Sequence, residues 1–80
     1  MKIEVLFFAE LKEIFGPFRP LEVADGARIT DIINRLALEA SDLERRRNTL
    51  RYAVNERFET SDSVLRAGDR LAILLPMSGG

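Results

Sequence analysis

The residues of this 80-residue sequence that could do unusual chemistry stand at its end, where Gly79 and Gly80 follow an aliphatic run over residues 71–75. Glycine has no side chain and reaches backbone angles forbidden to other residues, so such an end can extend into a narrow channel of another protein. We expect a flexible, extended tail over residues 76–80 whose reactive group is the C-terminal carboxyl of Gly80. The plainer interpretation is a frayed end without a function.

A carboxylate is a poor electrophile, so we expect a separate partner to use ATP and activate it as an acyl-adenylate. The chain has no G-x-x-x-x-G-K phosphate loop and no G-x-G-x-x-G motif, and we expect it to bind no cofactor itself. The activated carbonyl could take an amine, as in protein modifiers, or sulfide, which gives a thiocarboxylate. Because the sequence has no cysteine, any sulfur that it carries covalently has to sit on that terminus.

The residue types that are missing exclude several classes of function. Without Cys or His, the chain has no disulfides, thiol nucleophiles, imidazole bases or Cys/His metal sites. Twelve basic and thirteen acidic residues give no general attraction to nucleic acid or to an anionic membrane. Glu4 and Glu10 interrupt the first apolar run, so we expect no signal peptide and a cytoplasmic protein.

The elements that must position the tail begin with an alternating apolar pattern, which predicts a strand over residues 2–8. Leu11, Ile14 and Phe15 then have helical spacing, and Gly16-Pro17 predicts the end of that helix. A second strand follows in "FRPLEVADG". Because Pro20 cannot donate to a ladder, this strand is expected at the edge of a sheet.

The clearest helix is predicted to begin with Thr30 as its N-cap and Asp31 in its first turn. Its apolar residues recur every three or four positions: Ile29, Ile32, Ile33, Leu36, Ala37 and Ala40. A capping box over Ser41–Glu44 predicts a second, short helical turn. The rest is expected to be a strand, a turn near Asn55-Glu56 and a short return strand within residues 50–60, a turn at Ala67-Gly68-Asp69, and a final strand over residues 70–76.

This order lacks the strict alternation of a doubly wound fold and predicts a single α+β domain over residues 1–80, with a mixed sheet packed on one main helix. The first and last strands are both rich in apolar residues, so we place them side by side in the sheet centre. The C-terminal tail then projects from the middle of the sheet.

An apolar stripe on the sheet is the second candidate feature. If the odd-numbered residues of the first and last strands face the helix, then Leu6, Phe8 and Leu74 are left on the open side. A contiguous exposed patch there would mark a partner surface. Coverage by a loop or by the short helix is an alternative of equal weight.

Two groups of charged residues complete the candidates. Arg45-Arg46-Arg47 has acidic neighbours such as Glu44 and no aromatic platform, which favours a solvated helical face over a phosphate contact. Glu10 and Glu13 are three residues apart on a short helix beside Lys12. We interpret this acidic pair as surface charge and predict no catalytic dyad.

Three stretches, "VLFFAELKEIFG" at 5–16, "AVNERF" at 53–58 and "LRAGDRLAILLPMSGG" at 65–80, together resemble the small subunit of molybdopterin synthase. The resemblance implies a ubiquitin-like β-grasp fold. It also implies that an E1-like adenylyltransferase and a sulfur donor system convert the terminus to a thiocarboxylate. The catalytic positions carried over are Gly80 and, before it, Gly79.

The same resemblance implies that the tail inserts into the large synthase subunit. There its sulfur would attack cyclic pyranopterin monophosphate in molybdenum cofactor biosynthesis. Phe8 and Leu74 match family positions that pack against partners, and the tail entry Pro76, Met77 and Ser78 joins that interface. A heterotetramer of two small and two large subunits is implied, with no nucleic-acid or membrane partner and no catalysis by this chain alone.

The resemblance also shows one departure, since the family often has Pro-Pro before the tail where this chain has Leu75-Pro76. Three alternatives remain beside the synthase subunit. They are a sulfur carrier for thiamine or tRNA thiolation, a ubiquitin-like modifier that forms isopeptide bonds to lysines, and an inert ubiquitin-like binding module.

Overall fold

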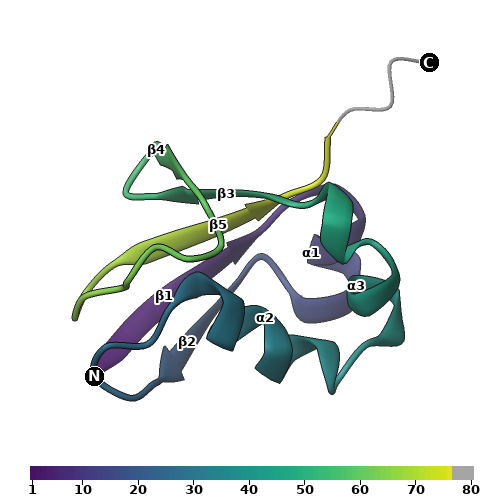
Figure 1. The fold of residues 1–80 in the computed structure, drawn as a ribbon. Coiled ribbons are helices and arrows are strands. Elements are labelled where there is room, and N and C mark those ends of the chain that lie inside the picture. Colours follow the sequence, from purple (N-terminus) through teal and green to yellow (C-terminus); the bar gives the residue numbers. More distant parts are fainter. Residues whose placement is uncertain (77–80) are drawn as a thin grey trace.

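The fold is a mixed five-stranded sheet with all its helices packed on one face (Figure 1). The computed structural model describes residues 1–76. The elements are β1 (Lys2–Phe7), α1 (Ala9–Phe15), β2 (Phe18–Glu22), α2 (Ile29–Ala37), α3 (Ser41–Arg45), the 3₁₀ turn η1 (Arg47–Thr49), β3 (Arg51–Val54), β4 (Arg57–Glu59) and β5 (Arg70–Leu74). The predicted α+β class is confirmed, and this is the β-grasp, ubiquitin-like arrangement.

The strand order β2-β1-β5-β3-β4 places the last strand in the middle of the sheet. β1 and β5 run parallel, with Val5 opposite Leu71, while the other pairs are antiparallel. The predicted pairing of the first and last strands is therefore confirmed. β2 lies at one edge, as Pro20 predicted, because its ring has no N–H to give to a further strand.

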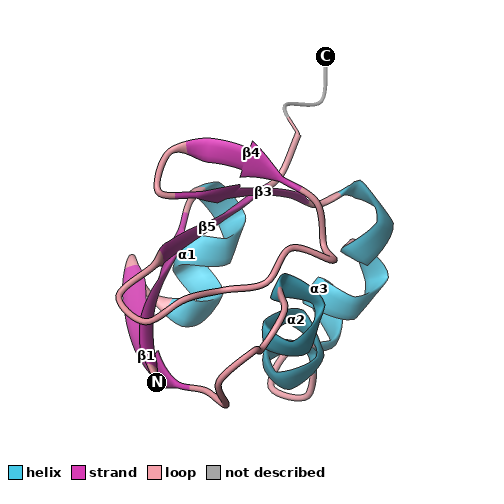
Figure 2. Cartoon of the chain, turned by 60° about the vertical axis from the view of Figure 1, so that its left-hand side comes forward, coloured by secondary structure: helices cyan, strands magenta, loops and turns pink. Residues whose placement is uncertain are grey.

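Helix α2 covers the inner face of the sheet, and Figure 2 shows it with α1 and α3 on that side. It begins after Arg28, so the prediction of Thr30 as N-cap is wrong. The Asp31 carboxylate accepts the backbone N–H of Arg28 at 2.8 Å, and the helix therefore starts two residues earlier than predicted. α2 has nine residues, and within residues 1–76 no helix is long and apolar enough to cross a membrane.

The short turn after α2 is confirmed as α3, but its predicted capping box is wrong. Ala40 is the N-cap, and no side chain caps the helix. Leu43 explains why the turn still forms, because this residue is completely buried in the core. Burial of one leucine therefore fixes the turn where a local cap was expected.

The core lies between the inner face of the sheet and the helices. Ile3, Val5 and Phe7 of β1 are at most 1% exposed, and the Phe7 ring stacks on Phe15 of α1 with centroids 4.8 Å apart. Ile14, which was grouped with the core side of α1, is instead 43% exposed. Leu11 and Phe15, which are four residues apart, form the narrow buried stripe of this helix, and Ile14 lies beside that stripe.

Two turns lie beside the start of β5, the turn of the β3–β4 hairpin and the turn that leads into β5. Asn55 and Glu56 form the predicted two-residue turn, with left-handed φ values of 51° and 70°. Asn55 is tied to β5, because its side-chain oxygen accepts the Arg70 N–H at 3.0 Å. In the second turn Gly68 has φ 85°, and Asp69 accepts the Arg66 N–H at 2.8 Å. These bonds give the Asn and Gly-Asp motifs of the sequence a structural role.

Candidate functional site

The C-terminal end of β5 positions whatever follows it. β5 is bonded on both sides, to β1 and to β3, so its end is fixed within the sheet. Leu75 then packs partly against the core, and Pro76 is exposed. The chain leaves the sheet at the end opposite the N-terminus (Figure 1). A rigid central strand therefore delivers residue 76 at one defined point of the surface.

The outer face of the sheet carries an apolar row that crosses all five strands. The row is set by register, since each residue stands directly opposite the next: Phe18, Leu6, Ala72, Ala53 and Phe58. Its two ends are large and exposed, with Phe58 at 74% and Phe18 at 56%. A row of this length is unusual on a face that no helix covers.

A second, shorter group lies beside this row, toward the point where β5 ends. Phe8 follows β1 and is 47% exposed, and Leu74 is half-buried near the end of β5. Arg51 stands opposite Leu74 in the register of β3 and β5. We call the five-residue row together with Phe8 and Leu74 the open-face patch. It is continuous with the strand that leads to the tail.

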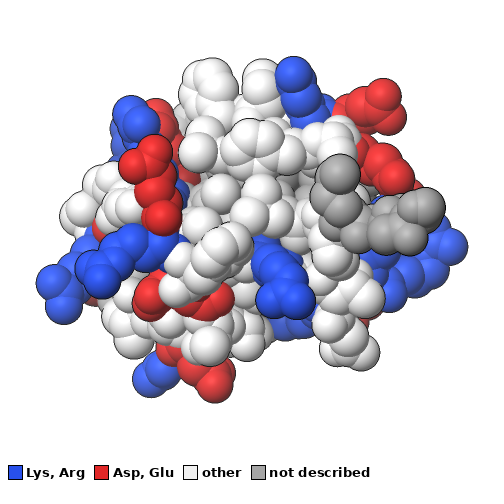
Figure 3. Space-filling view, turned by 90° about the horizontal axis from the view of Figure 1, so that it is seen from above, with Lys and Arg blue, Asp and Glu red and all other residues white. Residues whose placement is uncertain are grey.

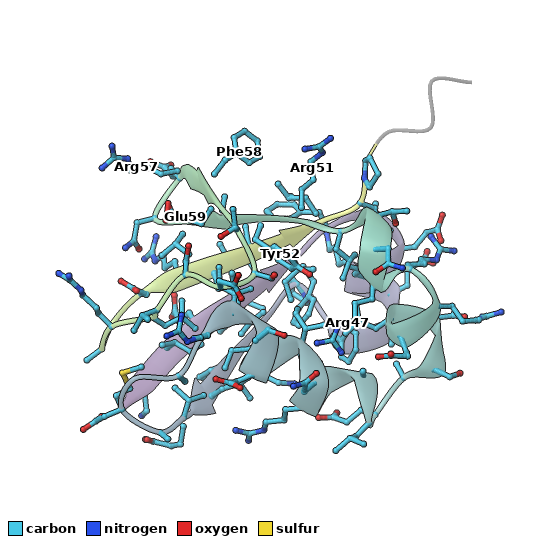
Figure 4. The ribbon with its side chains drawn as sticks, viewed as in Figure 1. Arg47, Arg51, Tyr52, Arg57, Phe58 and Glu59 are labelled. Carbon is cyan, nitrogen blue, oxygen red and sulfur yellow. The ribbon has the colours of Figure 1, made fainter. Side chains whose placement is uncertain are left out.

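Charged side chains border the open-face patch. Arg70 and Glu4 form an ion pair of 3.3 Å on one side. Arg51 borders the patch on the side of β3. It projects away from the helices, as does Phe58 of the patch itself (Figure 4). Seen from the direction in which they point, uncharged side chains cover much of the middle of the surface, with one Lys or Arg side chain close to the centre and most of the other charged side chains toward the edges (Figure 3). An apolar centre with a charged rim is typical of a protein-binding surface.

Within residues 1–76 no cluster of acidic, His or Cys side chains could hold a metal ion. Of the residues predicted from the sequence, the structure brings Phe8, Leu74 and Pro76 together at one end of the sheet. Met77, Ser78, Gly79 and Gly80 lie outside the described residues.

Phe18 and Phe58 are members of the patch that the sequence reasoning missed. The signal for Phe58 was present, because a two-residue turn at Asn55-Glu56 places it opposite Ala53 and hence on the same face. The position of Phe18 depends on the register of β2 against β1. A local pattern does not give this register.

The arginine run lies on the helical side and is paired with acids. Arg46 contacts Glu10 on α1 at 2.6 Å, Arg47 contacts Glu44 at 3.3 Å, and Arg45 pairs with Asp42. These pairs agree with the prediction of a charged helical face. They also account for Glu10 as a partner of an arginine.

Comparison with known proteins adds a family to this geometry. The ThiS family model matches residues 5–80. Two relatives, each called a molybdopterin synthase sulfur carrier subunit, match the whole chain. The one from Arabidopsis thaliana is 33% identical over 84% of its length, and the one from Chlamydomonas reinhardtii is 31% identical over 100%. The crystal structure of SAMP1 from Haloferax volcanii is 26% identical with a TM-score of 0.83, covering both chains fully.

Proposed function

The chain belongs to the ThiS family, and from that premise we propose that it is the sulfur carrier subunit of a molybdopterin synthase. Two relatives with this name match it over its whole length. The single structural observation that carries the proposal is the continuity between the open-face patch and β5, the strand that leads to Pro76. Docking of this face would bring the end of β5 to a fixed place on the partner.

The proposed chemistry takes place at the carboxyl of Gly80. An E1-like adenylyltransferase would let a carboxylate oxygen attack the α-phosphorus of ATP, which gives the acyl-adenylate and releases pyrophosphate. Sulfide from the donor system would then attack the carbonyl carbon, and the C–O bond to AMP would break as the C–S bond forms, leaving a thiocarboxylate. This chain has no thiol, so the sulfur atom has no other covalent site on it.

The partner that consumes the sulfur is proposed to be the large synthase subunit. Its pocket would receive Gly79 and Gly80, and the thiocarboxylate sulfur would attack cyclic pyranopterin monophosphate to form a C–S bond. Water would then cleave the acyl–sulfur bond and return the carboxylate of Gly80, and two such deliveries build the dithiolene. Phe8, Leu74 and the remainder of the open-face patch would pack against this subunit in a cytoplasmic complex of two small and two large chains. The present chain would supply the docking surface and the sulfur, with the groups that orient the pterin on the large subunit.

The experiment that tests the proposal is intact-mass analysis after incubation with the activating enzyme, ATP and a sulfur source. The expected product is a chain in which one oxygen at Gly80 is replaced by sulfur. A variant that lacks Gly80 should gain no sulfur, whereas Leu38→Glu, which alters an exposed residue of the helical side, should be charged normally. Normal sulfur loading of the chain without Gly80 would contradict the proposal.

A second candidate function is protein modification, favoured by the likeness to SAMP1, a small archaeal modifier protein. In that case the activated carbonyl of Gly80 would be attacked by a lysine ε-amine, with loss of AMP and formation of an isopeptide bond. The same reaction mixtures separate the two functions. Lysine conjugates of the chain in place of the thiocarboxylate would identify the modifier.

A further inference from the structure

A polar groove lies beside the β3–β4 hairpin, and its lining includes Phe58 from the edge of the open-face patch. It has a volume of about 420 Å³ and is bounded by η1, the start of β3, the end of β4 with the loop that follows, and the start of α2. The side chains important here are Thr30, Arg47, Asn48, Tyr52 and Ser61. A groove of this size is large enough for a small organic ligand.

Arg47 is the cation of the groove, and its guanidinium is held in place. One terminal nitrogen donates to the Thr30 hydroxyl at 2.9 Å, and the other contacts the Glu44 carboxylate at 3.3 Å. The side chain is 27% exposed. Two contacts leave further guanidinium N–H groups free to donate. The Thr30 hydroxyl accepts from Arg47, so its own hydrogen is also free to donate.

Tyr52 gives the groove an unpartnered hydroxyl. The residue is 8% exposed, and its phenol makes no hydrogen bond to any residue within 1–76. No side-chain oxygen in the same residues is both sealed from solvent and unbonded. The phenol oxygen therefore opens into the groove. Figure 4 shows Tyr52 and Arg47 in the space between β3 and the helices.

The electrostatics of Tyr52 connect it to Arg47. Burial raises the pKa of the phenol, and the nearby Arg47 charge opposes that rise. The phenol is thus a neutral donor at neutral pH that stands within range of a cation. Two acids are close: Glu44 is engaged with Arg47, and Glu59, which lines the groove, accepts a bond from the Ser63 hydroxyl at 3.2 Å and keeps its negative charge, which opposes an anion there. Arg51, at the rim of the groove, has no acidic partner within residues 1–76.

We propose that this groove is a binding site for a phosphate group, either free or as a phosphate monoester, with Arg47 and Tyr52 as its main donors. A guanidinium beside several hydroxyls suits a tetrahedral oxyanion, because each oxygen can accept from a different donor. Asn48 and Ser61 supply further neutral donors on opposite walls. The site is separate from the tail, so its existence does not depend on the sulfur-carrier function.

The test uses Tyr52 as its own reporter, since the chain has one tyrosine and no tryptophan. Tyrosine emission would be titrated with ribose 5-phosphate, with inorganic phosphate and with ribose, at ionic strength held constant by sodium chloride. Amide NMR spectra would be recorded in parallel. The expected result is a saturable change with one or both phosphates and none with ribose, with shifted amides in residues 47–52 and 58–61.

Variants identify the donors. Arg47→Gln should weaken phosphate binding about tenfold or more, since a charge-assisted bond is lost. Tyr52→Phe, followed by NMR, should weaken it a few-fold. Arg57→Gln is the matched control, because Arg57 lies on the same hairpin and does not line the groove; it should leave binding unchanged.

The pKa of Tyr52 is a readout that a purely structural role of Arg47 would not move in the same way. Bound phosphate should raise the pKa of Tyr52 further, because its negative charge disfavours the phenolate. In the Arg47→Gln variant the pKa of Tyr52 should already be higher before phosphate is added, and adding phosphate should not raise it further.

The outcomes separate the possible ligands. Equal binding of inorganic phosphate and ribose 5-phosphate identifies the phosphate group as the whole ligand, and tighter binding of the ester identifies a phosphorylated metabolite. A linear change without saturation, equal binding of ribose, or unchanged binding by Arg47→Gln would each overturn the proposal.

Discussion

The two faces of the central strands have similar apolar residues and opposite surroundings. On the inner face Leu71 and Ile73 are completely buried under the helices, whereas Leu74 of the same strand is half-buried on the outer face, and Phe58 of β4 on that same face is 74% exposed. Strands that are apolar on both faces normally have both faces covered. The helices here cover one face, so the apolar surface of the other is in excess of what folding of this chain uses. That excess is what a partner can bury.

The largest expected effect is the loss of stability when a side chain on the inner face is shortened. Ile73→Ala should lower the free energy of unfolding by about 2–5 kcal/mol, because it leaves a cavity in a tightly packed core. Urea denaturation followed by circular dichroism measures this. Leu74→Ala, one residue along the same strand, should lose only about 1 kcal/mol. Equal losses at the two positions would remove the distinction between the faces.

The next effect is on partner binding. Leu74→Glu should abolish association with the large synthase subunit, since it places a carboxylate in the open-face patch. The fold should be kept, because Arg51 stands opposite this position and can pair with the new charge. Size-exclusion chromatography of the mixed subunits measures the association. Leu38→Glu, at a residue that is 91% exposed on the helical side, should bind normally.

Phe58 sharpens the comparison at the edge of the sheet. Phe58→Ala should weaken binding of the same subunit about tenfold, because a large exposed aromatic ring at the end of the apolar row is a natural anchor. Val64→Ala is the control, since Val64 is 51% exposed and lies outside the patch. Calorimetric titration gives both dissociation constants. If the two variants have the same dissociation constant, the contact with the partner does not extend along the row as far as Phe58 on β4.

The smallest expected effect belongs to an exposed ion pair on the helical side. Arg19 donates to both carboxylate oxygens of Glu39 at 2.8 Å, and its guanidinium also lies 5.5 Å from the centre of the Phe15 ring. Glu39→Gln should cost about 0.5 kcal/mol, since both side chains of the pair are partly exposed and solvent screens them. Urea denaturation at low and high salt measures this cost. A loss comparable with that of Ile73→Ala would mean that charge contributes to stability as much as the core.

Much of the fold could be predicted because its signals are local. A few neighbouring residues are enough to indicate each of these features: the alternation in β1 and β5, the end of α1 at Gly16-Pro17 and the turn at Asn55-Glu56. Apart from Ile14, which is exposed, the predictions that were wrong concern helix starts. Thr30 and Ser41 are good caps by type, yet Asp31 closes the first turn of α2 from inside, and burial of Leu43 fixes α3 without a cap.

The candidate site was predicted in part for the same reason. The outward position of Phe8 follows from alternation along β1, and that of Leu74 from alternation along β5. Phe18 and Phe58 join them only through register between strands, and the groove that holds Arg47 and Tyr52 brings together Thr30, residues 47–52 and residues 58–61.

The sequence by itself determined which residues the chain could use: a Gly-Gly pair at residues 79 and 80, no Cys or His, and apolar residues in excess of one core. The tertiary structure decided which of these act together. Pairing of β5 between β1 and β3 fixed the place from which the chain leaves the sheet, and it aligned five apolar residues from five strands into one row. The physical reason is that side-chain type is a local property, whereas register and coverage are set by long-range pairing and packing.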